Sequence, residues 1–473
     1  MKKFTKILLI GCLLVTVSCN NWLDVEPKSQ VKDKDLFASE MGFKEALSGV
    51  YSLMTKEALY GKELTFGWLG VLGQEWTSVP YNYEDDQKYD FENAASEVRI
   101  DSVWTGLYNA IANANKLLKE LEGKENLFSG DNYSIIKGEV LALRAYLHFD
   151  LLRIFGASCA VGMERIAIPY VTEYAPTIFP QEKVGDFVGK VLKDLQDAAK
   201  CLENDPILTG RTVSEIDDNG YLMNRQVHLN YYAVKGLMAR VYLYKGDYAN
   251  AEVCAKEVIG SGCFEWVKQE NLTNESVADL TFSTEHLFAL NIVTLGNIVD
   301  KYLDGGNNSF ALEESRLSEY YGSSYDYRYL YLFKTGVGMS NTLRYLKKYD
   351  QLESVSWAQS YRNKLPLICL PEMYYILAEC RYHSSGDVLE PLNEVCRHRG
   401  VADLSEADLS AFETLLLAEY RKEVIGGGQL FFQYKRLNRS VVPGTDVDLA
   451  GEGRYVIPMP KEELENPGWV SNQ

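Results

Sequence analysis

Few side chains in this sequence could perform acid–base, nucleophilic or metal-assisted catalysis. The five histidines are scattered along the chain: His148, His228, His286, His383 and His398. They form no H-E-x-x-H motif and no pair at metal-ligand spacing. The sequence also contains no G-x-S-x-G elbow, no P-loop and no G-x-G-x-x-G turn after a strand, and Gly426-Gly427-Gly428 fits a turn at a helix end. We therefore predict no catalytic residue, no metal site and no cofactor.

One acidic run, Glu84-Asp85-Asp86, could be taken for the acid and base of a glycosidase. That chemistry depends on how far apart two carboxyl groups lie in space, which a run of consecutive residues does not reveal. We interpret the run as a solvated acidic loop. A secreted glycosidase remains an alternative, and it would need two carboxylates that converge in a cleft.

The cysteines indicate neither a disulfide framework nor a zinc site, because the sequence contains no C-x-x-C pair. Free cysteines usually behave as small buried hydrophobic residues. We expect that role, on helices, for the seven cysteines outside the N-terminal segment: Cys159, Cys201, Cys254, Cys263, Cys369, Cys380 and Cys396.

Side chains suited to ligand recognition are more abundant than catalytic ones, since the chain has 32 tyrosines and aromatic residues make up 12% of it. Tyrosine combines a flat apolar ring with a hydroxyl group, which suits stacking on sugar rings or peptides. Any single tyrosine can equally fill the core. The alternating residues Tyr325 to Phe333 are an example, because their period of two predicts a strand packed on the core. The predicted ligand-binding residues are Trp76, Tyr81, Tyr83, Tyr320, Tyr321 and Tyr325.

The N-terminus has the features of a secretory signal, with lysines before an apolar run from Ile7 to Val17. That run is about half of the roughly 20 residues that cross a bilayer, which disfavours a retained membrane span. Thr16-Val17-Ser18-Cys19 resembles the lipobox of bacterial lipoproteins, and predicts a signal peptide over 1–18 and lipidation of Cys19. Thr16 stands where the lipobox usually has leucine, so simple secretion is an alternative. Asn20 follows the cysteine at the position where an aspartate would indicate inner-membrane retention in some bacteria, so the sequence is compatible with an outer-membrane destination.

The net charge excludes one class of partner. It is −18, and loss of the signal lysines would make it more negative still. Such a surface repels phosphate backbones, and the chain has no run of lysine and arginine to offset this. We predict that nucleic acid is not a partner.

The elements that must position these residues are mostly helices. Apolar residues recur at intervals of three and four over 135–155, which predicts one long helix, and similar stripes cover 104–118 and 184–195. Residues 239–255 match the spacing of a tetratricopeptide helix pair, with Gly246-Asp247 as the turn. Further pairs are predicted at 133–155 with 183–204, 366–383 with 387–399, and 41–58 with 101–122. The fold class is therefore mostly α, a tetratricopeptide-like scaffold of helical hairpins.

Long insertions separate these helix pairs, at about 60–95, 157–182 and 261–350. Loops of that length are usually functional. The first and third insertions are rich in tryptophan and tyrosine, so we place the ligand site there. The predicted organisation is one domain over 19–473 with ligand-binding insertions at about 60–95 and 261–350.

The chain as a whole resembles the SusD/RagB family of outer-membrane nutrient-binding lipoproteins of Bacteroidetes. Leu143-Arg144-Ala145-Tyr146-Leu147-His148-Phe149-Asp150 is similar to the most recognisable stretch of that family, and Asn466-Pro467 to its closing motif. Tyr420 and Gln429 depart from the family pattern in the last helices. The resemblance implies a surface-exposed, lipid-anchored protein without catalytic activity. It would capture an oligosaccharide or oligopeptide and deliver it to a SusC-like, TonB-dependent outer-membrane transporter. A lipid-anchored repeat protein that only scaffolds other surface proteins is an alternative.

Overall fold

The computed structural model describes residues 34–209, 213, 220–274, 278–336, 342–351 and 361–472. The signal segment and Cys19 lie outside these residues. The described chain is mostly helical, as the apolar periodicity predicts. None of the helices in this part of the chain is both long enough and apolar enough to cross a bilayer.

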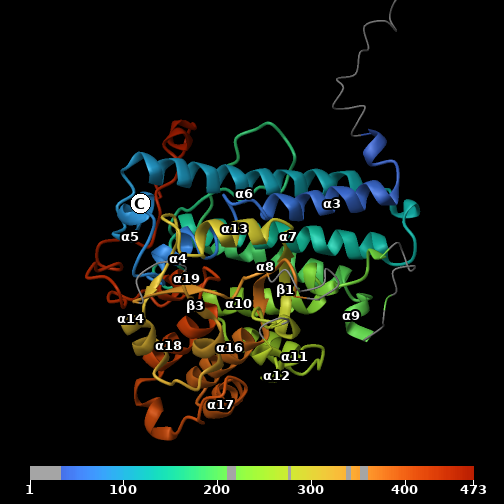
Figure 1. Ribbon diagram of the computed structural model, residues 1–473. Coiled ribbons are helices and arrows are strands. Elements are labelled where there is room, and N and C mark those ends of the chain that lie inside the picture. Colours follow the sequence, from blue (N-terminus) through green and yellow to red (C-terminus); the bar gives the residue numbers. More distant parts are fainter. Residues whose placement is uncertain are drawn as a thin grey trace, which may run out of the picture.

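The first layer consists of long antiparallel helices that run side by side (Figure 1). Helices α3 (Glu40–Met54) and α6 (Ala94–Leu121) lie over α7 (Asn132–Phe155), and α8 (Val184–Cys201) packs against the other side of α7. Because helices cover it on several sides, α7 is buried around almost its whole circumference. Side chains of Ser39 and Asn93 cap α3 and α6 by accepting hydrogen bonds from backbone N–H groups. The predicted pairings of these helices are confirmed.

The tetratricopeptide-like pair in the middle of the chain is also confirmed. Helices α10 (Tyr231–Lys245) and α11 (Tyr248–Ile259) are joined by Gly246, whose φ of +81° lies in the left-handed region that glycine tolerates best. The side chain of Asp247 then caps α11 by accepting a hydrogen bond from the N–H of Asn250. The short turn returns α11 along α10, so the pair forms the hairpin that the sequence predicts.

The last helices extend the same stacking. Helix α16 (Leu370–His383) packs on α11 and on α17 (Leu389–His398), and α18 (Phe412–Val424) and α19 (Leu430–Arg436) follow. Gly426 and Gly428 both have positive φ in the turn between α18 and α19, which confirms the turn predicted for the glycine run.

Two small antiparallel sheets lie among the helices. β1 (His286–Asn291) pairs with β5 (Lys364–Cys369), and β2 (Leu312–Glu313), β4 (Leu343–Leu346) and β3 (Phe333–Thr335) form a sheet in the order β2-β4-β3. The strand predicted over 325–333 is wrong, because most of this segment is the short helix α15 (Tyr327–Tyr331). The Asp326 side chain caps α15 and pairs with the fully buried Arg328, which also pairs with Glu419 and Glu423 of α18, so capping and ion pairing outweigh the alternating pattern.

The predicted insertions are not open loops but contain short elements of their own. These are α4 (Trp68–Leu72), η1 (Tyr81–Tyr83), α5 (Glu84–Gln87), α12 (Glu270–Thr273), η5 (Ser283–Glu285), α13 (Leu295–Tyr302) and α14 (Glu314–Tyr321). The other short helices are η2 (Glu125–Leu127), α9 (Pro206–Thr209), η4 (Arg225–Val227), η6 (Glu406–Ala411) and η7 (Lys461–Glu465). Many of their apolar side chains belong to the main hydrophobic core.

Buried arginine–carboxylate pairs connect the helices across this core. The pairs are Arg144–Asp194, Arg225–Glu139, Arg225–Asp205, Arg240–Glu372, Arg328–Glu419, Arg399–Glu285, Arg399–Glu423 and Arg436–Glu379. Each joins segments that are distant in the sequence. Removing one partner of such a pair leaves a desolvated charge, so these pairs fix how the helices are docked.

The seven cysteines of the described chain are free. Cys254, Cys380 and Cys396 are buried on helices, which confirms the expected role for these three, and burial raises the pKa of the Cys254 thiol to about 11. Cys159 is buried after the end of α7, and Cys369 lies in β5. Cys263 differs, since it is exposed beyond the end of α11.

His148 gives the fold a dependence on pH. It is fully buried on α7, where its Nε2 accepts a hydrogen bond from the N–H of Val171 at 2.9 Å and its Nδ1 lies 2.8 Å from the carbonyl oxygen of Arg144. This geometry holds the neutral ring with its proton on Nδ1. Burial lowers the pKa of His148 to about 3, and burial also lowers the pKa of His286 to about 4.

We expect the free energy of unfolding to fall as the pH drops from about 6.5 towards 5, by up to about 1.4 kcal/mol per pH unit for each of these histidines. The reason is that the unfolded state takes up protons there while the folded histidines stay neutral. Urea denaturation at pH 7, 6 and 5 measures this slope. The variant His148→Gln, which keeps a donor and an acceptor, should show a smaller slope, and an unchanged slope would contradict the assignment.

Candidate functional site

Three of the predicted ligand-binding aromatics are part of the core. Trp76 is 2% exposed and its Nε1 donates to the carbonyl oxygen of Phe66 at 2.7 Å. The Tyr83 hydroxyl donates to Glu63 at 2.8 Å, and the Tyr321 hydroxyl donates to the carbonyl oxygen of Lys422 at 3.1 Å. With rings and polar atoms both occupied, Trp76, Tyr83 and Tyr321 offer no face to a ligand in this structure. Their assignment to a ligand surface is corrected.

The other three predicted aromatics are accessible. Tyr81 is 86% exposed and Tyr325 is 76% exposed. Tyr320 is half-buried, and its ring lies on the guanidinium group of Arg421 at 4.1 Å. This cation–π contact covers one face of the Tyr320 ring and holds the ring in place. Among the described residues, neither the Tyr81 nor the Tyr320 hydroxyl has a hydrogen-bond partner within the protein.

The structure joins the first and third insertions near two of these tyrosines. The N–H groups of Thr77 and Ser78 both donate to the carbonyl oxygen of Ala311 at 3.0 Å, and the N–H of Ala311 donates back to Ser78. The N–H of Glu313 donates to the Thr77 hydroxyl at 2.7 Å. Segments more than 230 residues apart in the sequence are therefore neighbours at one end of the molecule, where Figure 1 shows α5 and α14.

We call this surface the loop face and define it by Thr77, Tyr81, Glu313, Arg316 and Tyr320. Tyr81 follows the bridge in η1, and the other tyrosine lies on α14, which begins directly after the bridged segment. Arg316 makes an exposed ion pair with Glu319 at 3.0 Å. Exposed pairs contribute little to stability, so the Arg316 guanidinium can turn to a ligand at small cost. The loop face thus combines aromatic rings with charged and hydroxyl groups.

Tyr325 lies in the turn after α14, next to the end of α17. It follows the end of α14, and its carbonyl group approaches Gly400 beyond the end of α17. The next residues are fixed there, since the N–H of Tyr327 donates to the carbonyl oxygen of Arg399 at 2.9 Å. Tyr325 therefore belongs to a turn held against α17, and its role in ligand binding stays a prediction.

The acidic run after Tyr83 divides into two parts. Glu84 and Asp85 are exposed, as a solvated loop predicts, but Asp86 is fully buried. Asp86 accepts a hydrogen bond from Trp68 Nε1 at 2.9 Å and pairs with Arg99. Burial raises the pKa of Asp86 to about 6, against the opposing effect of Arg99. Asp86 therefore holds α5 against α6 in a buried cluster in which Glu63 also pairs with Arg99, at 3.5 Å.

A groove that the sequence analysis missed lies between α6, the segment 169–179 and the C-terminal segment. It has a volume of about 420 Å³, and its aromatic lining residues are Trp104, Tyr108, Phe179 and Trp469. We call it the Trp104 groove. The only signal in the sequence was the spacing of Trp104 and Tyr108, which lie one turn apart on the same face of a helix.

The polar atoms of the groove's aromatic residues are engaged within the protein. Trp104 Nε1 donates to Glu463 at 2.9 Å, and the Tyr108 hydroxyl donates to the carbonyl oxygen of Pro169 at 2.9 Å. Trp469 Nε1 donates to the carbonyl oxygen of Phe179 at 3.2 Å. These bonds attach the C-terminal segment to α6. The Trp104 groove is thus first of all a docking seam for the chain's own C-terminal segment.

The described residues contain no set of side chains that could bind a metal ion. No group of three or more histidine, cysteine, aspartate or glutamate side chains there could hold a metal ion. The acidic residues near the loop face either point into solvent or pair with arginine. The arrangement can bind a ligand by stacking and hydrogen bonding.

Comparison with known sequences identifies relatives for the N-terminal half. Residues 21–243 match the SusD-like family, which is described as starch-binding and associating with the outer membrane. The SusD-like protein P38 of Formosa agariphila is 24% identical over 269 residues, which cover 56% of this chain and 47% of that relative. The SusD-like protein P25 of the same organism is 24% identical over 166 residues, or 31% of its length. The matched region spans about half or less of these relatives.

Comparison with solved structures extends the likeness to the whole chain. A SusD superfamily protein from Bacteroides thetaiotaomicron has a TM-score of 0.74 at 21% identity, covering 92% of this chain and all of that one. A SusD-like protein that binds laminarin has a TM-score of 0.62 at 18% identity, covering 91% of this chain and all of that one. At these identities the comparison shows a shared fold.

Proposed function

The chain belongs to the SusD-like family, and from that premise we propose that it binds a glycan at the cell surface and delivers it to an outer-membrane transporter. The family description, starch-binding and associating with the outer membrane, supports the ligand class and the location. The laminarin-binding neighbour with the same fold supports a glycan over a peptide. The protein acts without catalysis, by binding and release.

The observation that carries this proposal is the loop face. Two accessible tyrosines from segments far apart in the sequence are placed at one end of the fold by the bridge between Ser78 and Ala311. A sugar ring stacks on tyrosine through its apolar face, at about 0.5–1.5 kcal/mol per aromatic contact. The hydroxyls of Tyr81 and Tyr320, together with Glu313 and Arg316 of the third insertion, can hydrogen-bond the hydroxyl groups of the sugar. Tyr325 remains a candidate for a separate contact with a long ligand.

Anchoring and delivery complete the proposal. Acylation of Cys19 would tether the protein to the outer membrane. The sequence Ser18-Cys19 directly after an apolar run supports this modification. The family resemblance supports a SusC-like, TonB-dependent barrel as the partner that receives the glycan. The net charge of −18 repels a polyanionic ligand over most of the protein surface, so it favours an uncharged glycan there.

We expect Tyr81→Ala and Tyr320→Ala each to weaken glycan binding by about 1–2 kcal/mol, or about 5- to 30-fold, because each removes one stacking surface. Calorimetric titration with starch oligosaccharides and with laminarin measures this. Tyr174→Ala, which removes a tyrosine that is 48% exposed in the second insertion, is the matched control and should bind like the parent.

Three outcomes would contradict the site or the function. If Tyr81→Ala and Tyr320→Ala still bind glycan and Trp469→Ala does not, the glycan-binding site is the Trp104 groove. Absence of binding to any glycan of a broad panel by the folded protein would favour the scaffolding alternative. Release of shortened sugars on long incubation would show an enzyme.

A further inference from the structure

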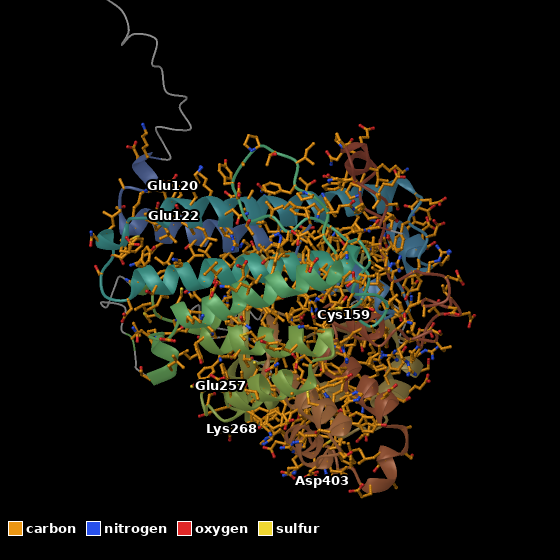
Figure 2. All side chains as sticks on the ribbon, turned by 180° about the vertical axis from the view of Figure 1, so that it is seen from behind. Glu120, Glu122, Cys159, Glu257, Lys268 and Asp403 are labelled. Carbon is orange, nitrogen blue, oxygen red and sulfur yellow. The ribbon has the colours of Figure 1, made fainter. Side chains whose placement is uncertain are left out.

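A cavity of about 390 Å³ lies where α7 ends, separate from the aromatic surfaces. Its walls come from the segment after α7, from α19 and from the loop 449–456, with Phe91 at one side. Figure 2 shows this region from behind, where Cys159, the neighbour of Ser158, lies to the right of Glu120 in the last turn of α6 and of Glu122 just after that helix. We call it the α7-end cavity.

Lys435 on α19 lines the cavity and is 0% exposed. Its Nζ donates one hydrogen bond, to the carbonyl oxygen of Ile154 at 3.2 Å. Within the described chain, no carboxylate pairs with it. An ammonium group has three donors, and a buried charge without a counter-ion is costly. Lys435 is the feature of this cavity that the fold by itself leaves unexplained.

Capping of α7 does not account for Lys435. The last carbonyl groups of α7 already accept hydrogen bonds, since Asn472 Nδ2 donates to Phe155 at 2.6 Å and the N–H of Ile457 donates to Ile154 at 3.2 Å. The N–H of Gly156 donates to Leu152 at 2.8 Å. A neutral residue at position 435 would therefore leave no helix carbonyl without a donor.

The other polar groups around the cavity are mostly donors. The Ser158 hydroxyl is buried and has no hydrogen-bond partner in the structure. The exposed Arg165 side chain has neither an ion pair nor a hydrogen-bond partner among the described residues. Arg454 pairs with Glu452 at 3.3 Å, and Glu452 is the one acidic side chain in the lining. The cavity thus holds three basic side chains and a hydroxyl without a partner among the described residues, in a protein whose net charge is −18.

We propose that the α7-end cavity is a binding site for an oxyanion, a sulfate or carboxylate group that bonds Lys435, Ser158 and Arg165. Ammonium, hydroxyl and guanidinium groups are the donors that bind such anions in proteins. The volume also accommodates the sugar ring of a uronic acid or a sulfated sugar. This inference is independent of the proposed glycan site, because the loop face has its own residues.

In the absence of an anionic partner, the surroundings of Lys435 disfavour its charged form. Burial lowers its pKa well below the usual value, and the nearby charges of Arg153 and Arg165 lower it further. Glu452, which faces the same cavity, is engaged by Arg454 and does not offset them. A bound anion would restore the charged form of Lys435.

The test is calorimetric titration of the whole protein at low ionic strength with sodium sulfate, with sodium glucuronate and with glucose. We expect one site for the anions and no binding of glucose at this site. Arg165→Gln and Ser158→Ala should weaken anion binding at least 10-fold and about 3-fold, respectively, and Lys435→Met should abolish it. Arg397→Gln, which removes an exposed arginine on α17, is the matched control and should leave it unchanged.

The two anions distinguish the source of the ligand. Binding of glucuronate supports a sugar-borne anion, and binding of sulfate alone supports a site for the free ion. No anion binding at millimolar concentrations, or equal binding in the parent, Arg165→Gln and Ser158→Ala, would overturn the proposal. These two variants decide the question if Lys435→Met does not fold. Laminarin binding at the loop face should be unaffected by them, so the two proposals fail independently.

Discussion

Replacing Trp76 with alanine is expected to lower the free energy of unfolding by about 3–5 kcal/mol, the usual cost of truncating a buried tryptophan. The side chain is 2% exposed, lies 6.1 Å from the ring of Phe310, and donates its N–H to the carbonyl oxygen of Phe66. The variant loses this packing and leaves the Phe66 carbonyl group without that donor. Urea denaturation followed by circular dichroism measures the change.

Tyr81→Ala is the control for this prediction, because it removes an aromatic side chain five residues away that is 86% exposed. Its free energy of unfolding should stay within about 0.5 kcal/mol of the parent. A Trp76→Ala variant that keeps parental stability but no longer binds glycan would contradict the structural role. It would return Trp76 to the ligand site.

Arg399→Met is expected to cost about 3–5 kcal/mol as well, because it strands two buried carboxylates. Arg399 is 0% exposed, and its Nη2 lies 2.6 Å from Glu285 and 2.7 Å from Glu423. Burial by itself raises the pKa of Glu423, and the charges of Arg399 and Arg328 lower it well below the usual range. Without Arg399, Glu423 would keep Arg328 and Lys348 nearby, but Glu285 would lose its arginine partner, and part of the cluster would take up protons.

The matched control lies two residues earlier, in the last turn of α17, which Arg399 directly follows. Arg397 is 43% exposed and pairs with Glu390 at 3.1 Å, so Arg397→Gln should change stability by less than about 0.5 kcal/mol. Thermal and urea denaturation of both variants at pH 7 compare them directly. An Arg399→Met variant within 1 kcal/mol of the parent would show that methionine packing replaces the ion pairs at no net cost.

The family departures at Tyr420 and Gln429 have a structural reading. Tyr420 is buried against Tyr375, with ring centroids 4.9 Å apart. Gln429 accepts a hydrogen bond from Arg153 on α7 at 2.9 Å. Both residues pack the last helices onto the scaffold, so neither changes the loop face.

The sequence by itself determined the scaffold. Apolar residues at intervals of three and four over 135–155 predict α7, and Gly246-Asp247 predicts the turn between α10 and α11, because these signals arise from neighbours in the chain. Such local patterns survive in the fold whenever one face of each helix is buried. The helix pairs follow from them, since short turns return a helix along its predecessor.

Only the tertiary structure decided which aromatics face a ligand. Tyr81 and Tyr83 are two residues apart in one short helix, yet one is exposed and the other buried. The reason is that the insertions pack on one another: Phe310 of the third contacts Trp76 and Tyr83 of the first, with ring centroids 6.1 Å and 5.1 Å apart. Contacts over such sequence separations leave no periodic signal in either segment. The exposure of a tyrosine there depends on a partner more than 200 residues away, which local composition does not specify.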